Sequence, residues 1–514
     1  MKQLLKNPFF YLSVVFYLAS AVVIGYMFSC CLDDAMWGDE GFSLGLIEFD
    51  LGWIAYRTLY DVHPPLYYVI LKMLTAFGAD KIIMGKIVSV LPFVAVFVYG
   101  LTFLRKDFGP FTAAFITFAL CTAPQFFRYS SEIRMYSWAI GFVGATLVHA
   151  YEVIDKPKQI LSWIFLSFHT VCAAYTNYFA AIAVFFVWIG LLVIFVTRNK
   201  KQFLRFCITG VVSILLYLPW AILYIKASYG QYGSIGGDVL FEKWRFFYAF
   251  AFGYAIPWYY FQFLLGALFT VVFVLSLVRF KLDSLNLMSV IAYGSYLCFF
   301  LLILISPKVT SHPIEYHYLL PASGLPFLTA AAQTGRLIGS FRIEDIKTPA
   351  LSAVWNGVSK LLLPVSLLCC ITVGGISTTV FQVERQRAEA ESFAVYREAV
   401  LDRVNEGDVV VSRSLAFTYP VLYCQLPHAQ RALWQRVEEP LQKDCIKVWS
   451  VDPLIEALAE GKQVFFYDDG TMGEAVKLLK QHCDEQGIPH TDLGTWTQVD
   501  TVNCATSTIY LFGS

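Results

Sequence analysis

Residues 178–197 read YFAAIAVFFVWIGLLVIFVT, without one charged side chain. A helix of this length is about 30 Å long, which matches the hydrocarbon core of a bilayer. The segment therefore predicts a membrane-spanning helix, and the chain on either side of it contains ten more of similar character. These are 8–28, 86–104, 110–124, 137–154, 160–176, 206–226, 258–278, 285–305, 318–335 and 354–378. A twelfth apolar segment, 64–79, is shorter and contains Lys72.

The composition separates two parts of the chain. Hydrophobic residues make up 57% and charged residues 15% of the 514 positions, against roughly 25% charged in soluble domains. Residues 381–514 contain 20 acidic and 12 basic residues, so their net charge of −8 cancels the +8 of residues 1–380. We predict a membrane domain over 1–380 and a soluble domain over 381–514. The zero net charge of the whole chain gives no reason to expect a nucleic-acid partner.

The soluble part alternates between two kinds of segment. Short β-type runs are followed by stretches with helical spacing and good helix formers, which predicts a small α/β domain. The expected strands are 408–412, 447–450, 464–467 and 507–512, and the expected helices are 452–460 and 472–486. The cysteines of this part could form up to two disulfides if it is exported. They are Cys424, Cys445, Cys483 and Cys504.

Basic residues indicate how the membrane domain is oriented, because Lys and Arg concentrate in cytoplasmic loops. Six basic clusters fall on one side only if 64–79 does not cross the membrane, although Lys81 and Lys86 then lie outside. The clusters are Lys2 and Lys6, Arg105 and Lys106, Lys156 and Lys158, 198–205, Arg279 and Lys281, and 336–347. We therefore expect an integral, multi-pass protein of the plasma (inner) membrane. The outer regions would be 29–85, 125–136, 227–257, 306–317 and the C-terminal domain.

Ionisable residues interrupt the expected outer loops in three places. The first loop contains Asp33-Asp34-Ala35-Met36-Trp37-Gly38-Asp39-Glu40, followed by an amphipathic stretch and then by Asp61-Val62-His63-Pro64-Pro65. The second contains Arg128, Glu132 and Tyr136, whose spacing by four would place them on one helical face. The third contains Lys308, His312, Glu315 and His317. A solvated loop, an intrahelical ion pair and a capping histidine are the structural alternatives, but charges beside membrane helices usually have a function.

Together these motifs resemble the GT-C superfamily of integral-membrane glycosyltransferases. The closest branch is that of the protein O-mannosyltransferases and lipid A aminoarabinose transferases. The resemblance covers about residues 1–335 and implies a GT-C-like membrane domain. Together with the apolar spans and the C-terminal pattern, it leads us to expect a polytopic α-helical membrane protein with about 11–13 transmembrane helices and a small C-terminal α/β extracytoplasmic domain. The motifs are 37–40 (WGDE), 63–68 (HPPLYY), 129–137 (YSSEIRMYS) and 318–321 (YLLP).

The resemblance implies transfer of a sugar from a polyprenyl-phosphate donor to a glycan, lipid or protein acceptor outside the cytoplasm. The acidic pair maps to Asp39, expected to be the general base, with Glu40 second. The implied substrate-binding residues are His63, Arg128, Glu132, Arg134, Tyr136, Lys308 and His317. This chain departs from the family at His317, where an Arg is usual, so phosphate binding could fall to Lys308, Arg128 or Arg134.

No cofactor is required for such a transfer. A divalent metal, magnesium or manganese, could be bound by oxygen and nitrogen ligands of the first loop and His63. The main rival function is a transporter or flippase of a lipid-linked sugar, and another is a sugar-polymer ligase or polymerase. A transporter should show repeat symmetry and charges near the middle of its helices, and the sequence shows neither.

Overall fold

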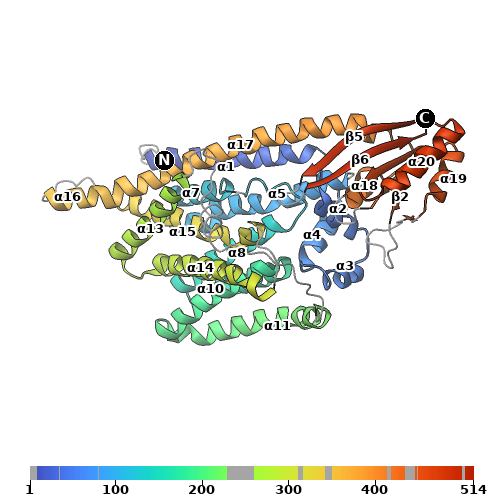
Figure 1. The fold of residues 1–514 in the computed structure, drawn as a ribbon. Coiled ribbons are helices and arrows are strands. Elements are labelled where there is room, and N and C mark those ends of the chain that lie inside the picture. Colours follow the sequence, from blue (N-terminus) through green and yellow to red (C-terminus); the bar gives the residue numbers. More distant parts are fainter. Residues whose placement is uncertain are drawn as a thin grey trace.

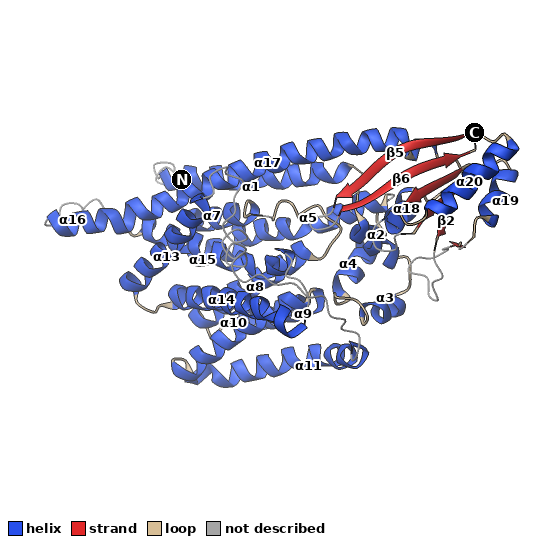
Figure 2. Ribbon diagram, in the orientation of Figure 1, coloured by secondary structure: helices blue, strands red, loops and turns tan. Residues whose placement is uncertain are grey.

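The computed structural model describes the chain except residues 1–7, 34, 79, 125, 229–259, 311–315, 342–349, 414–417, 435–445, 449, 500–503 and 514. A few further side chains, among them those of 304–310, 316 and 317, also lie outside the description. Figure 2 shows that the described strands lie together at one end of the molecule and that helices form the rest.

The N-terminal part is a bundle of helices (Figure 1). These are α1 (Pro8–Ser29), α2 (Gly38–Leu46), α3 (Leu51–Thr58), α4 (Leu66–Thr75), α5 (Lys81–Tyr99), α6 (Arg105–Phe108), α7 (Pro110–Cys121), α8 (Tyr136–Asp155), α9 (Ile160–Thr176), α10 (Tyr178–Thr197), α11 (Phe203–Ser228), α13 (Tyr260–Phe280), α14 (Ser284–Thr310), α15 (Leu320–Gly339), α16 (Ala350–Gly357) and α17 (Leu363–Ala399). Two π turns, Gly100–Leu104 and Val358–Leu362, connect α5 to α6 and α16 to α17.

Within the described residues, each of the eleven predicted spans overlaps a helix, although 110–124 extends three residues beyond the end of α7. Among the described residues, eight helical runs are long and apolar enough to cross a membrane, and α4, α7 and α9 are apolar but shorter. The prediction of a polytopic α-helical membrane protein is therefore confirmed.

Helices α1 and α5 are antiparallel, and this decides the position of α4. Near the end of α5, the Tyr17 hydroxyl donates a hydrogen bond to the carbonyl of Gly100 at 2.7 Å. Near the start of α5, the Lys86 ammonium lies 2.6 Å from the Asp33 carboxylate, just after α1. The chain thus leaves and re-enters the bundle at the same end, so α2, α3 and α4 all lie there and 64–79 does not cross.

The two lysines that counted against this arrangement are both paired. Lys81 lies 2.5 Å from Glu48, and Lys86 bonds both the carboxylate and the carbonyl of Asp33. Because each lysine is paired with a nearby carboxylate, neither lysine argues against an outer location for the end of the bundle that contains α2, α3 and α4.

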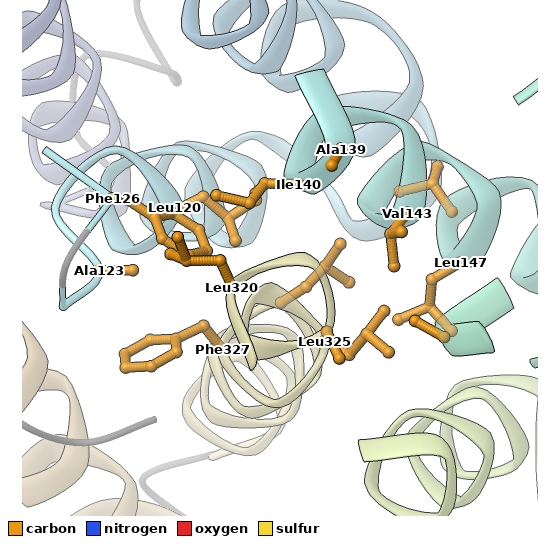
Figure 3. Close-up of a cluster of buried hydrophobic side chains, with 14 of the residues drawn as sticks. Leu120, Ala123, Phe126, Ala139, Ile140, Val143, Leu147, Leu320, Leu325 and Phe327 are labelled. Atoms are coloured by element: carbon orange, nitrogen blue, oxygen red, sulfur yellow. The ribbon is translucent and has the colours of Figure 1, made fainter. Parts of the chain in front are cut away.

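Helix α15 is the centre of the bundle. Every side chain from Leu320 to Gly335 is buried, and the helix packs against α7, α8, α13, α14 and α17. Figure 3 shows its Leu320, Leu325 and Phe327 meeting side chains of α7, α8 and the turn after α7. Gly335 allows a close approach to α7, because a Cβ there would lie 2.4 Å from the Thr112 hydroxyl oxygen.

Helix α17 connects the two parts of the chain. Its first half is apolar, and it continues through residue 380, where the composition changes, as a charged helix to Ala399. Figure 1 shows it running from the helical bundle to the sheet.

The C-terminal domain is a six-stranded mixed sheet of order β3-β2-β1-β4-β6-β5. The strands are β1 (Val409–Ser412), β2 (Gln430–Leu433), β3 (Ile446–Lys447), β4 (Val464–Asp468), β5 (His490–Val499) and β6 (Cys504–Phe512). Strands β3, β2, β1 and β4 are parallel, and β6 is antiparallel to both β4 and β5. Helices α19 (Asp452–Ala459) and α20 (Gly473–Gln486) pack against β4.

The predicted α/β domain is confirmed, with corrections at its weaker elements. Strands β1, β4 and β6 and both helices lie where the sequence placed them, whereas β3 begins one residue earlier than predicted and ends at Lys447. The sequence analysis missed β2, β5 and helix α18 (Thr418–Gln425). The polar sequence of β5 gives little local indication of a strand, and its long pairing with the neighbouring β6 holds it at the sheet edge.

Helix α18 joins the sheet domain to the membrane domain by packing against α2. Val421 is fully buried in the core of the membrane domain, and the Cys424 sulfur lies 3.9 Å from the Gly41 carbonyl. Cys424 and Cys483 are free thiols, and the side chains of Cys445 and Cys504 lie outside the described residues. The sheet domain therefore rests on the helix that carries Asp39 and Glu40.

Candidate active site at the sheet-domain end of the bundle

The short helix α2 positions the two acidic residues of the first motif. Trp37 precedes the helix in an extended conformation, and Asp39 and Glu40 occupy its first turn. Carboxylates are favourable there because the helix N-terminus carries a partial positive charge. Although adjacent, the two side chains face different surroundings.

Glu40 is buried and is held by backbone groups. Its two carboxylate oxygens accept hydrogen bonds from the N–H of Trp37 at 3.0 Å and of Ile133 at 2.8 Å. Burial raises the pKa of the Glu40 carboxyl, and the Lys86 charge and these backbone bonds oppose that effect. Glu40 thus fastens the loop between α7 and α8 to the start of α2.

Asp39 faces a buried arginine of the same loop. The Asp39 Oδ2 atom lies 3.1 Å from Arg134 Nη2, and the Asp39 side chain is 38% exposed while that of Arg134 is 5% exposed. Arg134 Nη1 also approaches the Asp39 carbonyl at 3.4 Å and the Ser43 hydroxyl at 3.3 Å. The guanidinium is therefore fixed against α2, and the carboxylate keeps an open side.

A second carboxylate, Asp61, belongs to this group and was missed in the sequence analysis. Burial raises the pKa of Asp61, and the nearby Arg134 charge partly counters this. The Tyr68 hydroxyl donates to Asp61 Oδ2 at 3.2 Å. In the sequence, Asp61 stands two residues before His63 in the polar stretch 61–65, and this position is the signal that could have identified it.

The charge of Arg134 is stabilised by these two acids. Burial lowers the pKa of a guanidinium, but Asp39, with a contribution from Asp61, outweighs burial and raises the Arg134 pKa well above its usual value. The Arg134 Nε atom is buried without a hydrogen-bond partner among the described residues. The site thus combines a permanent cation with the Asp39 carboxylate at 3.1 Å and the buried Asp61 carboxyl within the reach of its charge.

His63 and Tyr136 form an aromatic wall beside this group. Both are buried, and their rings meet edge to face at 6.5 Å. The His63 Nδ1 atom lies 3.5 Å from the amide nitrogen of Asn177, which caps α10. The rings of Tyr129 and Tyr136 are 5.1 Å apart. These contacts fix the His63 ring at the junction of α4, α8 and α10.

Arg128 and Glu132 form an ion pair, which was the structural alternative to a binding role, but they do not lie on a helix. Their side chains are 4.0 Å apart, and described residues between 126 and 135 form turns and bends before α8 begins at Tyr136. The prediction of one helical face carrying Arg128, Glu132 and Tyr136 is therefore wrong. Arg128 and Glu132 line a different cavity, which faces α17.

The third polar cluster is only partly within the described structure. Lys308 lies in the last turn of α14, and His317 lies in the 3-10 turn Tyr316–Leu319 before α15. The side chains of both residues, and all of 311–315, lie outside the described residues. Their roles remain predictions.

Among the described residues, three of the metal ligands suggested by the sequence contact other groups. Asp33 bonds Lys86, Glu40 bonds two backbone N–H groups and His63 lies beside Asn177, while Asp34 is not described. Within the described part of the chain, no three His, Cys, Asp or Glu side chains are arranged to hold a metal ion.

Comparison with known proteins finds similar structures but no similar sequences. No protein-family model and no curated protein matches the sequence. A crystal structure of ArnT from Cupriavidus metallidurans bound to undecaprenyl phosphate is similar with a TM-score of 0.59 and 14% identity, over 96% of this chain and 97% of that one. ArnT from the same organism in the apo state gives a TM-score of 0.58 and 14% identity, over 97% of each chain. The chain therefore has the fold of ArnT along nearly its whole length, and the predicted architecture, a polytopic α-helical membrane domain followed by a small α/β domain, is confirmed.

Proposed function

We propose that the protein is a membrane glycosyltransferase that moves a sugar from a polyprenyl-phosphate donor to an acceptor on the extracytoplasmic face. The observation that carries the proposal is the Asp39–Arg134 pair, a half-exposed carboxylate against a buried guanidinium. Its setting is a fold similar to a protein crystallised with undecaprenyl phosphate. The acceptor class, whether glycan, lipid or protein, stays open.

Asp39 acts as the general base. Its carboxylate takes the proton of an acceptor hydroxyl while that oxygen forms a bond to the anomeric carbon of the sugar. The bond from the anomeric carbon to the phosphate oxygen breaks, and the polyprenyl phosphate leaves with the electron pair. Attack opposite the leaving group inverts the anomeric centre.

Arg134 orients the base. Its Nη2 atom lies 3.1 Å from Asp39 Oδ2, and its contact with Ser43 fixes the guanidinium against α2, so the carboxylate is held in one position. Leaving-group charge requires a further cation. We assign this role to Lys308, with His317 nine positions later in the chain as a second candidate, because Arg128 already pairs with Glu132.

An extracytoplasmic location for the site is supported by the distribution of basic residues. Arg105 and Lys106 follow α5 at the end of the bundle opposite the sheet domain, and Lys156 pairs with Asp107 at that same end. Positive residues of membrane proteins concentrate on the cytoplasmic side. This orientation makes the Asp39 end, and the sheet domain resting on it, extracytoplasmic.

The decisive experiment compares surface glycans and polyprenyl-phosphate sugars in cells with and without the gene. A transferase predicts one missing sugar together with accumulated donor on the outer leaflet. Restoration of that sugar by the wild-type chain but not by Asp39→Asn would tie the change to the proposed base. Unchanged glycans with donor trapped on the inner leaflet would overturn the proposal in favour of a flippase.

A further inference from the structure

The cavity lined by Arg128 and Glu132 has a volume of about 490 Å³ and lies between the end of the membrane domain, the charged half of α17 and the sheet domain. Its volume is within the range of roughly 300–1,000 Å³ that is typical of small-molecule sites. Glu40 lines it, whereas Asp39 and Arg134 are not among its lining residues. The cavity therefore adjoins the Asp39–Arg134 pair without including it, and it also contains Arg128 and Glu132, which the resemblance implies for substrate binding.

One wall is a single face of α17. The lining residues Gln382, Gln386, Glu389, Phe393 and Tyr396 recur every three or four positions, which places them on one side of the helix. This face is polar near the membrane domain and aromatic near the sheet. Hydrogen-bonding groups and ring faces thus line the same cavity.

The sheet provides a second aromatic wall, and its position is fixed. The hydroxyls of Tyr396 and Tyr467 are 2.8 Å apart, and the rings of Tyr396 and Trp496 meet edge to face at 5.4 Å. Ser507 also lines the cavity and is paired with Trp496 across β5 and β6. Figure 1 shows the end of α17 beside β5, the strand that carries this indole.

The charged side chains of the cavity neutralise one another. Each lining cation has a carboxylate partner that also lines the cavity: Lys86 with Asp33 at 2.6 Å, Arg385 with Glu389 at 2.7 Å, and Arg128 with Glu132 at 4.0 Å. The remaining lining carboxylate, that of Glu40, accepts two backbone hydrogen bonds. A charged ligand would therefore find no unpaired opposite charge, whereas these oxygens can still accept hydrogen bonds from hydroxyl groups.

We propose that this cavity binds an uncharged saccharide. Such a ligand has apolar C–H faces that pack on aromatic rings and a rim of hydroxyls that bond carboxylates, amides and serine hydroxyls. Trp496 and Phe393 supply rings, and Gln382, Gln386 and Ser131 supply partners for the hydroxyls. The bound sugar belongs either to the acceptor glycan or to a free saccharide. The site does not depend on the proposed transfer reaction.

The test measures saccharide binding to the full chain in lipid nanodiscs, free of glycoside detergents, by saturation-transfer NMR. Lactose is the neutral probe, lactobionate its anionic counterpart and a glucosamine disaccharide the cationic one. We expect lactose to bind in preference to both charged probes, and Trp496→Ala to weaken lactose binding at least tenfold. Trp434→Ala is the matched control, because Trp434 packs on Phe466 in the same sheet and does not line the cavity.

The same measurement on Asp39→Asn separates this site from the transfer centre. Lactose binding that persists in Asp39→Asn supports the proposal even if no transfer activity is found. A raised KM for the acceptor in Trp496→Ala identifies the ligand as part of the acceptor, and an unchanged KM identifies it as a separate saccharide. No lactose binding, or equal binding by wild type, Trp496→Ala and Gln382→Ala, would overturn the proposal.

Discussion

Arg134 Nη2 lies 3.1 Å from Asp39 Oδ2, although the two residues are 95 positions apart in the chain. The contact joins the loop before α8 to the first turn of α2. It also distinguishes Asp39 from its neighbour Glu40, whose oxygens are occupied by backbone N–H groups. The pair therefore identifies which of two adjacent acids is available for chemistry.

Asp39→Asn should reduce transfer by about 10²–10⁴-fold, since an amide cannot accept the acceptor's proton. The variant should still insert in the membrane and unfold near the wild-type temperature, because Asp39 is partly exposed. Donor turnover by the purified variant checks the first statement, and thermal unfolding checks the second. Glu48→Gln, which changes another acid at this end, is the control and should stay active.

Arg134→Ala should affect mainly stability, whereas Arg134→Lys should affect mainly activity. Alanine removes the cation beside the partly exposed Asp39 and the buried Asp61 and leaves a cavity where the guanidinium was, so this variant should be less stable and accumulate poorly. Lysine keeps the charge but not the fork that reaches Asp39 and Ser43 together. We expect Arg134→Lys to fold with a kcat at least tenfold lower. A fully active Arg134→Lys would contradict the positioning role.

Gly335→Ala should destabilise the bundle by about 1–3 kcal/mol, because its Cβ would lie 2.4 Å from the Thr112 hydroxyl oxygen of α7. Gly339→Ala on the same helix is the matched control, since a Cβ there meets nothing within 4 Å. The unfolding temperatures of both variants in one detergent give the comparison. Equal unfolding temperatures for the two variants would contradict the close packing of α15 against α7 at Gly335.

Cys424 should resist alkylation at pH 8 while the sheet domain stays docked. Burial raises the pKa of this thiol to about 12, so at pH 8 only about one thiol in ten thousand is ionised, and the thiolate is the reactive form. Modification should speed up as pH rises toward 12, or when denaturant separates α18 from α2. Peptide mass spectrometry reports the rate, with Lys477→Cys on the exposed face of α20 as a reactive control.

Chelation of divalent metal should leave transfer intact. Asp33, Glu40 and His63 each contact another group, and no three His, Cys, Asp or Glu side chains of the described residues are arranged to hold a metal ion. A transfer assay with and without EDTA, followed by added manganese or magnesium, gives the answer. Activity that EDTA removes and manganese restores would show that a metal takes part.

The sequence by itself determined the membrane helices, the soluble α/β domain and the end of the bundle at which the acidic loop lies. Those features depend on local quantities, namely the length of an apolar run, the alternation of strand and helix patterns and the placement of Lys and Arg. The basic clusters even predicted that 64–79 does not cross, because orientation in a membrane is decided by charge counts along the chain.

Only the tertiary structure decided which acid is open and which is structural. Asp39 and Glu40 are adjacent and chemically alike, and the residues that distinguish them, Arg134 and Ile133, come from a loop far along the chain. The same holds for Asp61, which joins the group through Arg134, and for Arg128, whose predicted helical face is a series of turns. Burial, pairing and long-range contacts are properties of the packed chain, so local sequence patterns do not contain them.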